Sequence, residues 1–404
     1  MSKAGTKGDK ALRELKYFLI VFLLFLGSGA TQSYVAPYVK SLGFSSLQGT
    51  AVVAAIYFAQ IPARFLAIYL ANALGLKASL ILGILGYVIY PLAFAASRAY
   101  WQLVLVMVFW GFTSGVFWTS AGVAVLNESA RSRYGKASGA LFAGSGVGMA
   151  LGVLLLDQLV AREGSRAMFI LSALPPALAL AIGFAVSAGG RLESKSTWEA
   201  TREGVVRAFR EREVSFVALL LFVSALSYGI VYGGLGLLIA RNVGMAYIGR
   251  LTVSFFILKG IFSRVGGSIG DAIGRRMSFI LSFISASIAS FILATSPGKL
   301  GLVVAGALLG YQVSTVSVNA NAWVGDAAKQ EHRAGFTGVI QAANALGVCV
   351  ALLAGGYLLS SIQGSRVLFF AFALINSLAV ILAVAMPEKR RARLGMGSAM
   401  AKRP

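Results

Sequence analysis

Long apolar runs recur along the whole chain, and they constrain its fold more than any other feature of the sequence. Runs of roughly 18 or more predominantly apolar residues follow one another from residue 17 to residue 386, and such a run can cross a bilayer as an α-helix. Hydrophobic residues make up 58% of the 404 residues and charged residues only 12%, about half the charged share of a soluble domain. The sequence therefore predicts an all-α polytopic membrane protein.

The runs predict twelve membrane helices, and the basic residues test that number. The expected helices lie at 17–39, 46–73, 77–97, 100–127, 134–160, 166–188, 213–241, 246–270, 277–296, 299–325, 333–361 and 364–386. Of the 36 lysines and arginines, 25 fall on the side of the two termini, 7 fall on the opposite side and 4 lie within helices. The positive-inside rule then places both termini in the cytoplasm. We expect a multi-pass protein of the plasma membrane.

The net charge of +22 also bears on partners and chemistry. The basic residues are spread over short loops and do not form one patch. They therefore indicate contact with anionic lipids of the cytoplasmic leaflet and argue against binding of nucleic acid. Cys349 is the only cysteine and His332 the only histidine. This inventory cannot supply a disulfide, a metal cluster or a catalytic triad within the membrane. We therefore expect no cofactor, no metal site and no enzymatic activity.

A polar segment divides the chain into two halves. Residues 189–212 carry no long apolar run, so the predicted organisation is an N-terminal six-helix half at 1–188, a cytoplasmic linker at 189–212, and a C-terminal half at 213–404 with a basic tail. Trp198, Val205 and Phe209 recur near helical spacing within this linker. They favour an amphipathic helix on the membrane surface, with a disordered linker as the alternative.

The two halves are related by an internal repeat. A single shift of 199 residues places Asn72 on Asp271 and Gly75 on Gly274, and it keeps its register over helices 2 to 5 and 8 to 11. Parallel six-helix repeats related by an axis along the membrane normal are a known transporter design. The repeat therefore points to two pseudo-symmetric bundles around a central cavity, which can function as a monomer.

The segment from Gly267 to Arg276 carries the family resemblance. Gly267, Asp271, Gly274, Arg275 and Arg276 match the motif Gly-x-Leu-Ala-Asp-Arg-x-Gly-Arg-Lys, and the chain thereby resembles the major facilitator superfamily. The resemblance implies a transporter that works by alternating access, with this motif as a latch that holds the cytoplasmic side shut. The expected latch residues are Gly267, Asp271, Gly274, Arg275, Arg276, Arg264, Asp326 and Arg333 in the second half, and Asn72, Gly75, Lys77, Glu128, Arg131 and Arg133 in the first.

Charges within the membrane point to the substrate. Lys259 precedes Asp271 by 12 residues, which puts it roughly 18 Å deeper along a helix and near the midplane of an apolar core about 30 Å thick. No acid lies in the middle of an expected helix, so an anion or a water-filled cavity must offset this charge. The repeat places Gln60 on Lys259 and Arg64 one turn away, so both are expected to face the same cavity; the alternative for Arg64 is a structural arginine.

Other polar and aromatic residues on the expected cavity helices complete the candidate site. The substrate-binding candidates are Lys259, Arg64, Gln60, Gln32, Tyr34, Trp110, Ser114, Tyr228, Tyr232, Tyr311, Gln312, Gln341 and Asn344, with Trp118 as a further residue of helix 4. Packing without ligand contact is the alternative for the aromatic members. The expected function is transport of a small solute, an organic anion or carboxylate by the charge argument. Export of hydrophobic drugs stays open because Gly139, Gly148 and Gly152 partly match a drug-antiporter pattern; a non-transporting receptor or an enzyme is the remote alternative.

Overall fold

The protein is described here by a computed structural model that covers residues 7–129, 134–185, 198–236, 238–239, 248–295, 298–328, 333–359 and 361–386. Every element in these ranges is a helix. In chain order they are α1 Lys7–Leu24, η1 Phe25–Gly29, α2 Gln32–Ser41, α3 Ser46–Ala73, α4 Leu76–Ala96, α5 Tyr100–Glu128, α6 Tyr134–Leu171, α7 Leu174–Ala185, α8 Trp198–Arg210, α9 Arg212–Gly229, η3 Ile230–Leu235, α11 Ile248–Ile273, α12 Arg275–Thr295, α13 Lys299–Ala327, α14 Arg333–Leu358 and α15 Ile362–Ala385. The predicted all-α class is confirmed.

The helices agree with twelve membrane crossings. Among the described residues, ten stretches are long and apolar enough to span a bilayer, and one of them, Ala137–Phe184, has 48 residues. It contains a break at Gly164, whose φ of 80° is not helical, so it accounts for two crossings. The remaining crossing is α11, which carries Arg250, Lys259 and Arg264 and lies outside the ten apolar stretches.

The first crossing is interrupted near its middle. Gly27 lies within the wide turn η1, and its φ of −99° and ψ of −105° are not helical. The neighbouring Ser28 donates its hydroxyl hydrogen bond to the carbonyl oxygens of Tyr87 and Ser172, at 2.5 and 3.3 Å. The main-chain carbonyl of Ser28 accepts from the hydroxyls of Thr31 and Tyr90, at 2.7 and 2.9 Å. Side-chain hydroxyls thus replace a helical hydrogen bond, which a buried break within a membrane requires.

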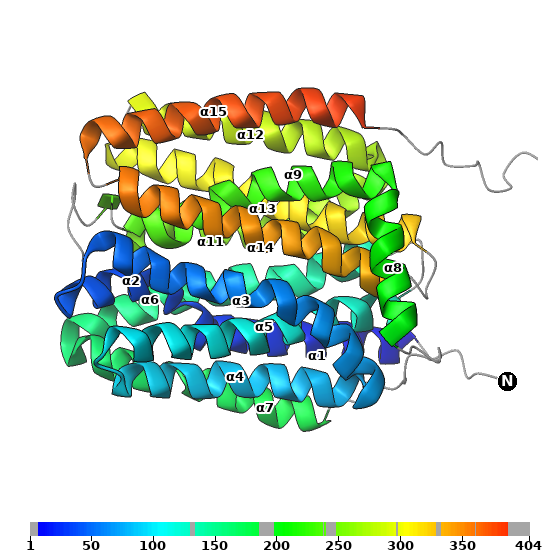
Figure 1. The fold of residues 1–404 in the computed structure, drawn as a ribbon, viewed down its shortest axis with the longest axis horizontal. Coiled ribbons are helices and arrows are strands. Elements are labelled where there is room, and N and C mark those ends of the chain that lie inside the picture. Colours follow the sequence, from blue (N-terminus) through cyan, green and yellow to red (C-terminus); the bar gives the residue numbers. More distant parts are fainter. Residues whose placement is uncertain are drawn as a thin grey trace, which may run out of the picture.

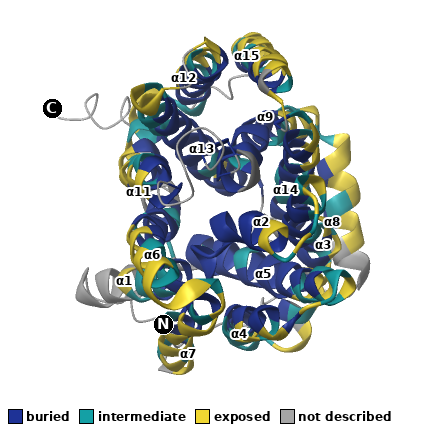
Figure 2. Cartoon of the chain, turned by 90° about the vertical axis from the view of Figure 1, so that its left-hand side faces the viewer, coloured by how far each residue is buried: buried dark blue, intermediate teal, exposed yellow. Residues whose placement is uncertain are grey.

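Helices of the two sequence halves lie in two groups. In Figure 1, α1 to α7 occupy the lower part of the molecule and α9 to α15 the upper part, with their axes roughly parallel. Figure 2 looks along these axes and shows buried residues facing inward and exposed residues around the perimeter. Large apolar side chains are prominent there, including Phe58 at 70% and Leu300 at 78% exposure, as expected for a surface whose solvent is lipid. The division at residues 188 and 213 stays a prediction.

Two helix pairs form the most extensive contacts between the groups in the described part of the chain, and both come very close. On one side, a Cβ atom at Gly146 of α6 would lie 2.4 Å from the Cα of Gly260 in α11, so this crossing requires glycine. On the other side, Cys349 of α14 donates through its sulfur to the carbonyl of Ala54 in α3, at 3.4 Å. Small residues permit this approach of helix backbones in membranes.

Helix α8 lies across one end of the bundle, at the right of Figure 1. Its Gly204 packs against Gly335 at the start of α14, where an added Cβ would be 2.6 Å from the Gly204 backbone. Ala208 is buried, whereas Phe209 is 66% exposed. The helix expected in the linker is therefore present, and the apolar side chain of Phe209 lies outside the bundle. The Trp198 side chain, residues 189–197 and the basic tail lie outside the described residues.

Candidate functional site

A cavity lies at the centre of the molecule, between the two groups of helices. Its volume is about 80 Å³, enough for several water molecules. Both groups contribute to its wall. The lining residues are Phe25, Gln32, Ile56, Tyr57, Gln60, Arg64, Tyr87, Trp110, Ser114, Trp118, Phe142, Ser145, Tyr228, Lys259, Val313, Ser317, Gln341 and Asn344.

Lys259 reaches this cavity from α11 and is 5% exposed. Its ammonium nitrogen lies 3.4 Å from the hydroxyl of Tyr228, to which it donates. The same nitrogen lies 5.0 Å from the centroid of the Tyr228 ring and 5.8 Å from that of Phe25. Aromatic faces attract a cation, but they leave donor capacity of the ammonium group unused.

Arg64 enters from α3, in the other group, and is 4% exposed. Its Nη2 donates to Oε1 of Gln60 at 3.0 Å, and Gln60 in turn donates to the hydroxyl of Ser114 at 2.9 Å. The Nε and Nη1 atoms of Arg64 are buried without a hydrogen-bond partner. Unsatisfied buried donors carry a desolvation cost, and this cost is larger for charged groups. The guanidinium is therefore held by Gln60 through one nitrogen, while two of its donors have no partner in the protein.

The cavity carries positive charge without compensation from the protein. Within the described part of the chain, no Asp or Glu lines the cavity, and the ion pairs found there involve neither Arg64 nor Lys259. Both cations lie in a water-poor interior, where electrostatic interactions are stronger than in bulk water. This arrangement attracts anions and disfavours cations.

The structure brings most of the predicted site residues together. Nine of the thirteen candidates line the cavity: Gln32, Gln60, Arg64, Trp110, Ser114, Tyr228, Lys259, Gln341 and Asn344. Trp118 lines it as well. The four others are Tyr34, Tyr232, Tyr311 and Gln312.

Those four have other partners. Tyr34 donates to a carboxylate oxygen of Asp157 at 2.6 Å, and the hydroxyl of Tyr232 accepts from Tyr228 at 2.7 Å. Tyr311 packs its ring edge-on against Phe262 at 4.7 Å, and Gln312 donates to Asn376 at 3.2 Å. For Tyr311 and Gln312 the cause is simple: the face of α13 that lines the cavity carries Val313 and Ser317, one turn apart, and their neighbours in sequence point elsewhere.

Several lining residues were missed by the sequence reasoning. They are Phe25, Ile56, Tyr57, Tyr87, Phe142, Ser145, Val313 and Ser317. Tyr57 had a usable signal, because it precedes Gln60 by three residues and Arg64 by seven and so shares their helical face. Its hydroxyl accepts a hydrogen bond from Gln32 at 2.7 Å. Phe25 had no such signal, since its position depends on the helix break at Gly27.

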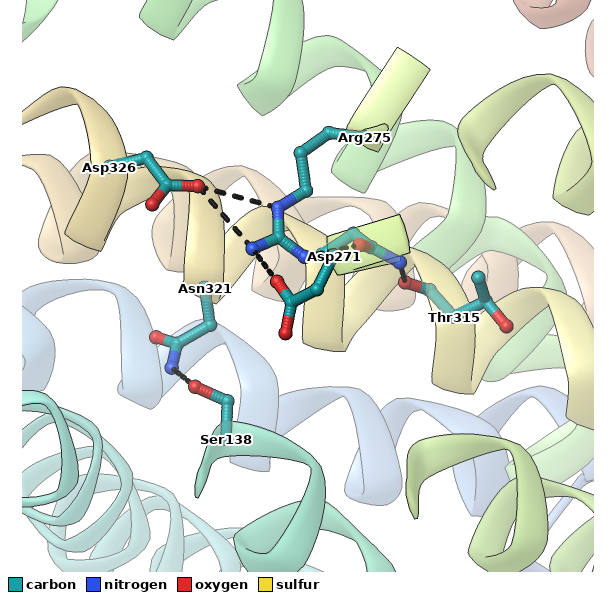
Figure 3. Close-up of polar contacts among 7 residues, drawn as sticks. Ser138, Asp271, Arg275, Thr315, Asn321 and Asp326 are labelled. Atoms are coloured by element: carbon teal, nitrogen blue, oxygen red, sulfur yellow. Dashed lines mark hydrogen bonds and ion pairs between the residues drawn. The ribbon is translucent and has the colours of Figure 1, made fainter. Parts of the chain in front are cut away.

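The latch motif forms a polar cluster around Arg275, at the start of α12 (Figure 3). The guanidinium pairs with Asp271 at the end of α11 and with Asp326 at the end of α13, at 3.3 Å from the latter. It also donates to the side-chain oxygen of Asn319 at 3.0 Å. A Cβ atom at Gly270 would overlap that oxygen. The cluster therefore ties three helices of the second half together.

Other latch residues depart from the expectation or fall outside the description. Arg276 donates to the main-chain carbonyl of Val384 instead of to an acid, and its repeat partner Lys77 donates likewise to that of Phe184, at 2.8 Å. The two basic residues thus anchor the last helix of each half. Arg264 is exposed on α11, whereas Gly267 is buried there. Residues 131 and 133, and the side chains of residues 72, 128 and 333, lie outside the described part, so a first-half latch (Asn72, Gly75, Lys77, Glu128, Arg131 and Arg133) and the role of Arg333 stay predictions.

A buried hydrogen bond between the groups lies close to this cluster. Asn321 of α13 donates from Nδ2 to the hydroxyl of Ser138 in α6 at 2.8 Å, as Figure 3 shows. Both side chains are buried. The sequence reasoning did not single out either residue. The contact links the helix that carries Asp326 to the opposite group.

Comparison with known proteins agrees with this architecture. The family model described as Major Facilitator Superfamily matches residues 17–220 and 217–399. "Citrate exporter 1" of Aspergillus niger is 27% identical over 211 residues, which are 51% of this chain and 40% of that protein. The match therefore spans about two-fifths of the length of this curated relative.

Solved transporter structures share the fold. The nucleoside transporter NupG superimposes with a TM-score of 0.72 at 14% identity, covering 93% of this chain and 100% of that one. The human organic anion transporter MFSD10 (TETRAN) gives a TM-score of 0.73 at 13% identity, covering 93% and 99%. At such identities the likeness is one of fold.

Proposed function

This chain belongs to the major facilitator superfamily, and from that premise we propose that it carries a small organic anion through the central cavity. The family makes it a multi-pass secondary transporter and not an enzyme. The proposal concerns the cargo and the site. Lys259 and Arg64 are the residues we expect to attract the anion, because both line the cavity and both are buried.

The uncompensated charge of the cavity carries the proposal. A single charged side chain near the bilayer centre costs at least about 2.5–3.5 kcal/mol, and here two such side chains lack an acidic partner among the described residues. A bound anion offsets this cost, whereas a bound cation increases it. The Aspergillus niger relative is named a citrate exporter, and a carboxylate cargo agrees with that name.

The cavity position supports a transport cycle by alternating access. The cavity is lined by η1, α2, α3, α4, α5 and α6 from one group and by α9, α11, α13 and α14 from the other. Access from either end requires the groups to separate there, as in other repeat-built transporters. At the α8 end the separation breaks the bond between Asn321 and Ser138. At the opposite end it parts Asp157 of α6 from the start of α11, where a Cβ at Gly249 would lie 2.3 Å from the carboxylate.

The orientation in the cell follows from the charge pattern. We propose that the α8 end faces the cytoplasm, because both termini and most of the basic residues are expected there. Helix α8 would then rest on the inner leaflet of the plasma membrane. Its exposed Phe209 and Val206 would enter the lipid, and Arg202, Arg207 and Arg210 would contact anionic headgroups. The protein would act as a monomer.

Uptake into proteoliposomes tests the proposed cargo. Purified protein is reconstituted and offered labelled succinate, lactate, citrate, phosphate, uridine and glucose. We expect uptake of at least one carboxylate, and we expect Lys259→Ala to abolish it while Lys40→Ala, a change of an exposed lysine at the end of α2, leaves it intact. Uptake of neutral solutes alone, or carboxylate uptake unchanged by Lys259→Ala, would refute an anion-binding role for the cavity.

Drug export is the second candidate, because aromatic rings form much of the cavity wall. Phe25, Tyr57, Tyr87, Trp110, Trp118, Phe142 and Tyr228 all line it, and such surfaces bind apolar ligands. The two basic side chains argue against cationic drugs. Expression in a pump-deficient host separates the candidates: growth protection against neutral or anionic hydrophobic compounds, together with no carboxylate uptake, would favour drug export.

A further inference from the structure

The two cations of the cavity come from opposite halves of the molecule. Arg64 belongs to α3 and Lys259 to α11, and the internal repeat aligns Gln60, the partner of Arg64, with Lys259 itself. Gln32 adds hydrogen-bonding groups from the first half, and Gln341 and Asn344 add them from the second. A ligand in this cavity therefore meets a cation on each side.

We infer that the cavity is specific for a small dicarboxylate, with one carboxylate bound to Arg64 and the other to Lys259. The inference rests on the proposed function and narrows it. A monocarboxylate compensates only one of the two buried charges, and the other stays uncompensated in the protein interior, which is costly. A dicarboxylate compensates both and links the two halves through a single ligand.

The free donors agree with two separate carboxylate contacts. Arg64 keeps Nε and Nη1 without partners, while Gln60 holds the third nitrogen. The ammonium of Lys259 has one long contact, 3.4 Å to the Tyr228 hydroxyl, and otherwise faces aromatic rings. Charge-assisted hydrogen bonds to carboxylates are stronger than such contacts. Each cation can therefore bind a carboxylate without first breaking an ion pair.

The cavity is small, with a volume of about 80 Å³. This size favours a small dicarboxylate over a larger tricarboxylate such as citrate, the cargo named for the fungal relative.

Binding of matched ligands tests the inference. Succinate, its half-amide succinamate and butyrate are compared on the purified full-length protein by thermal shift and by competition for uptake in proteoliposomes. Succinamate keeps the length and one charge and replaces the second carboxylate by an amide. We expect succinate to bind about ten- to a hundredfold more tightly than succinamate, the range that one charge-assisted hydrogen bond provides.

Variants of each cation complete the test. Lys259→Gln and Arg64→Gln should each abolish the preference for succinate over succinamate, while Lys40→Gln, outside the cavity, should retain it. Equal binding of succinate and succinamate by the wild-type protein, with both weakened by Lys259→Gln, would overturn the dicarboxylate inference and leave the proposed anion transport standing. Failure to bind or transport any of the three acids or citrate would overturn both. If a variant does not fold, the wild-type comparison of succinate with succinamate decides alone.

Discussion

Replacing Lys259 by methionine should make the protein more stable and should abolish its function. Lys259 is buried at 5% exposure without an acidic partner among the described residues. Methionine fills similar space without a charge, and removal of a buried charge in favour of an apolar group of similar volume is often stabilising. The expected change in stability is therefore opposite in sign to that of most core substitutions.

The magnitude follows from two opposing contributions. An uncompensated charge near the bilayer centre costs at least about 2.5–3.5 kcal/mol. Contacts of the ammonium with the rings of Tyr228 and Phe25, at 5.0 and 5.8 Å, offset about 0.5–1 kcal/mol each. The net gain expected for Lys259→Met is about 1–2 kcal/mol. With an unfolding entropy of about 2.1 cal/mol/K per residue, a chain of 404 residues would show a rise in Tm of about 1–2 °C.

Thermal unfolding in detergent, with and without succinate, measures both effects. The wild-type protein should gain about 2.7 kcal/mol from a ligand at a hundredfold its Kd, and Lys259→Met should start from a higher Tm and show no shift with ligand. Lys40→Met is the control, since Lys40 is exposed. A clear loss of stability in Lys259→Met would refute the reasoning, because it would mean that the ammonium is satisfied by the fold itself.

Three further predictions concern the contacts around the cavity. Asp271→Asn should weaken the Arg275 cluster by about 0.5–1 kcal/mol and increase cysteine-probe accessibility at the α8 end more than Asn72→Asp decreases it; equal and opposite effects would argue against an unequal latch. Gly146→Leu should stop uptake by preventing the close crossing of α6 and α11, at a cost of about 1–3 kcal/mol, and uptake at the wild-type rate would show that the crossing tolerates a side chain. Asn321→Ala should lower the free energy of unfolding by about 1–3 kcal/mol, because it leaves the Ser138 hydroxyl unsatisfied. A double-mutant cycle with Ser138→Ala should give a coupling energy of at least about 0.5 kcal/mol. A coupling energy of zero would mean that this hydrogen bond does not join the groups.

Much of the candidate site was predictable because the repeat and the membrane depth act together. Lys259 was placed near the midplane by its distance from Asp271, and Gln60 and Arg64 were placed opposite it by the shift of 199 residues. All three line the cavity. Helix periodicity then added Ser114 and Tyr228, because polar side chains on a membrane helix avoid lipid and face the interior.

Two of the differences arose where a helix is not regular. Tyr232 follows Tyr228 by four residues and was expected on the same face, but it lies within the wide turn η3, Ile230–Leu235. Its hydroxyl accepts a hydrogen bond from the hydroxyl of Tyr228 and donates one to the sulfur of Met149. It therefore does not line the cavity. Phe25 enters the wall only because the break at Gly27 redirects the first crossing. Spacing rules assume a continuous helix, and they fail at such turns.

The sequence by itself determined the class of the protein, the number of its crossings and the charge of its site. These properties depend on local composition. Each apolar run must be long enough to cross the bilayer, and each basic residue in a loop affects the orientation of its neighbouring helices largely independently of the other loops. The tertiary structure decided which side chains meet. The close approach of Gly146 to Gly260 fixes how α11 packs against α6. The hydrogen bond from the Ser28 hydroxyl to the Ser172 carbonyl holds the break in the first crossing in place. Those contacts join residues more than a hundred positions apart, and packing of this kind follows from the shapes of whole helices, which no single stretch of sequence contains.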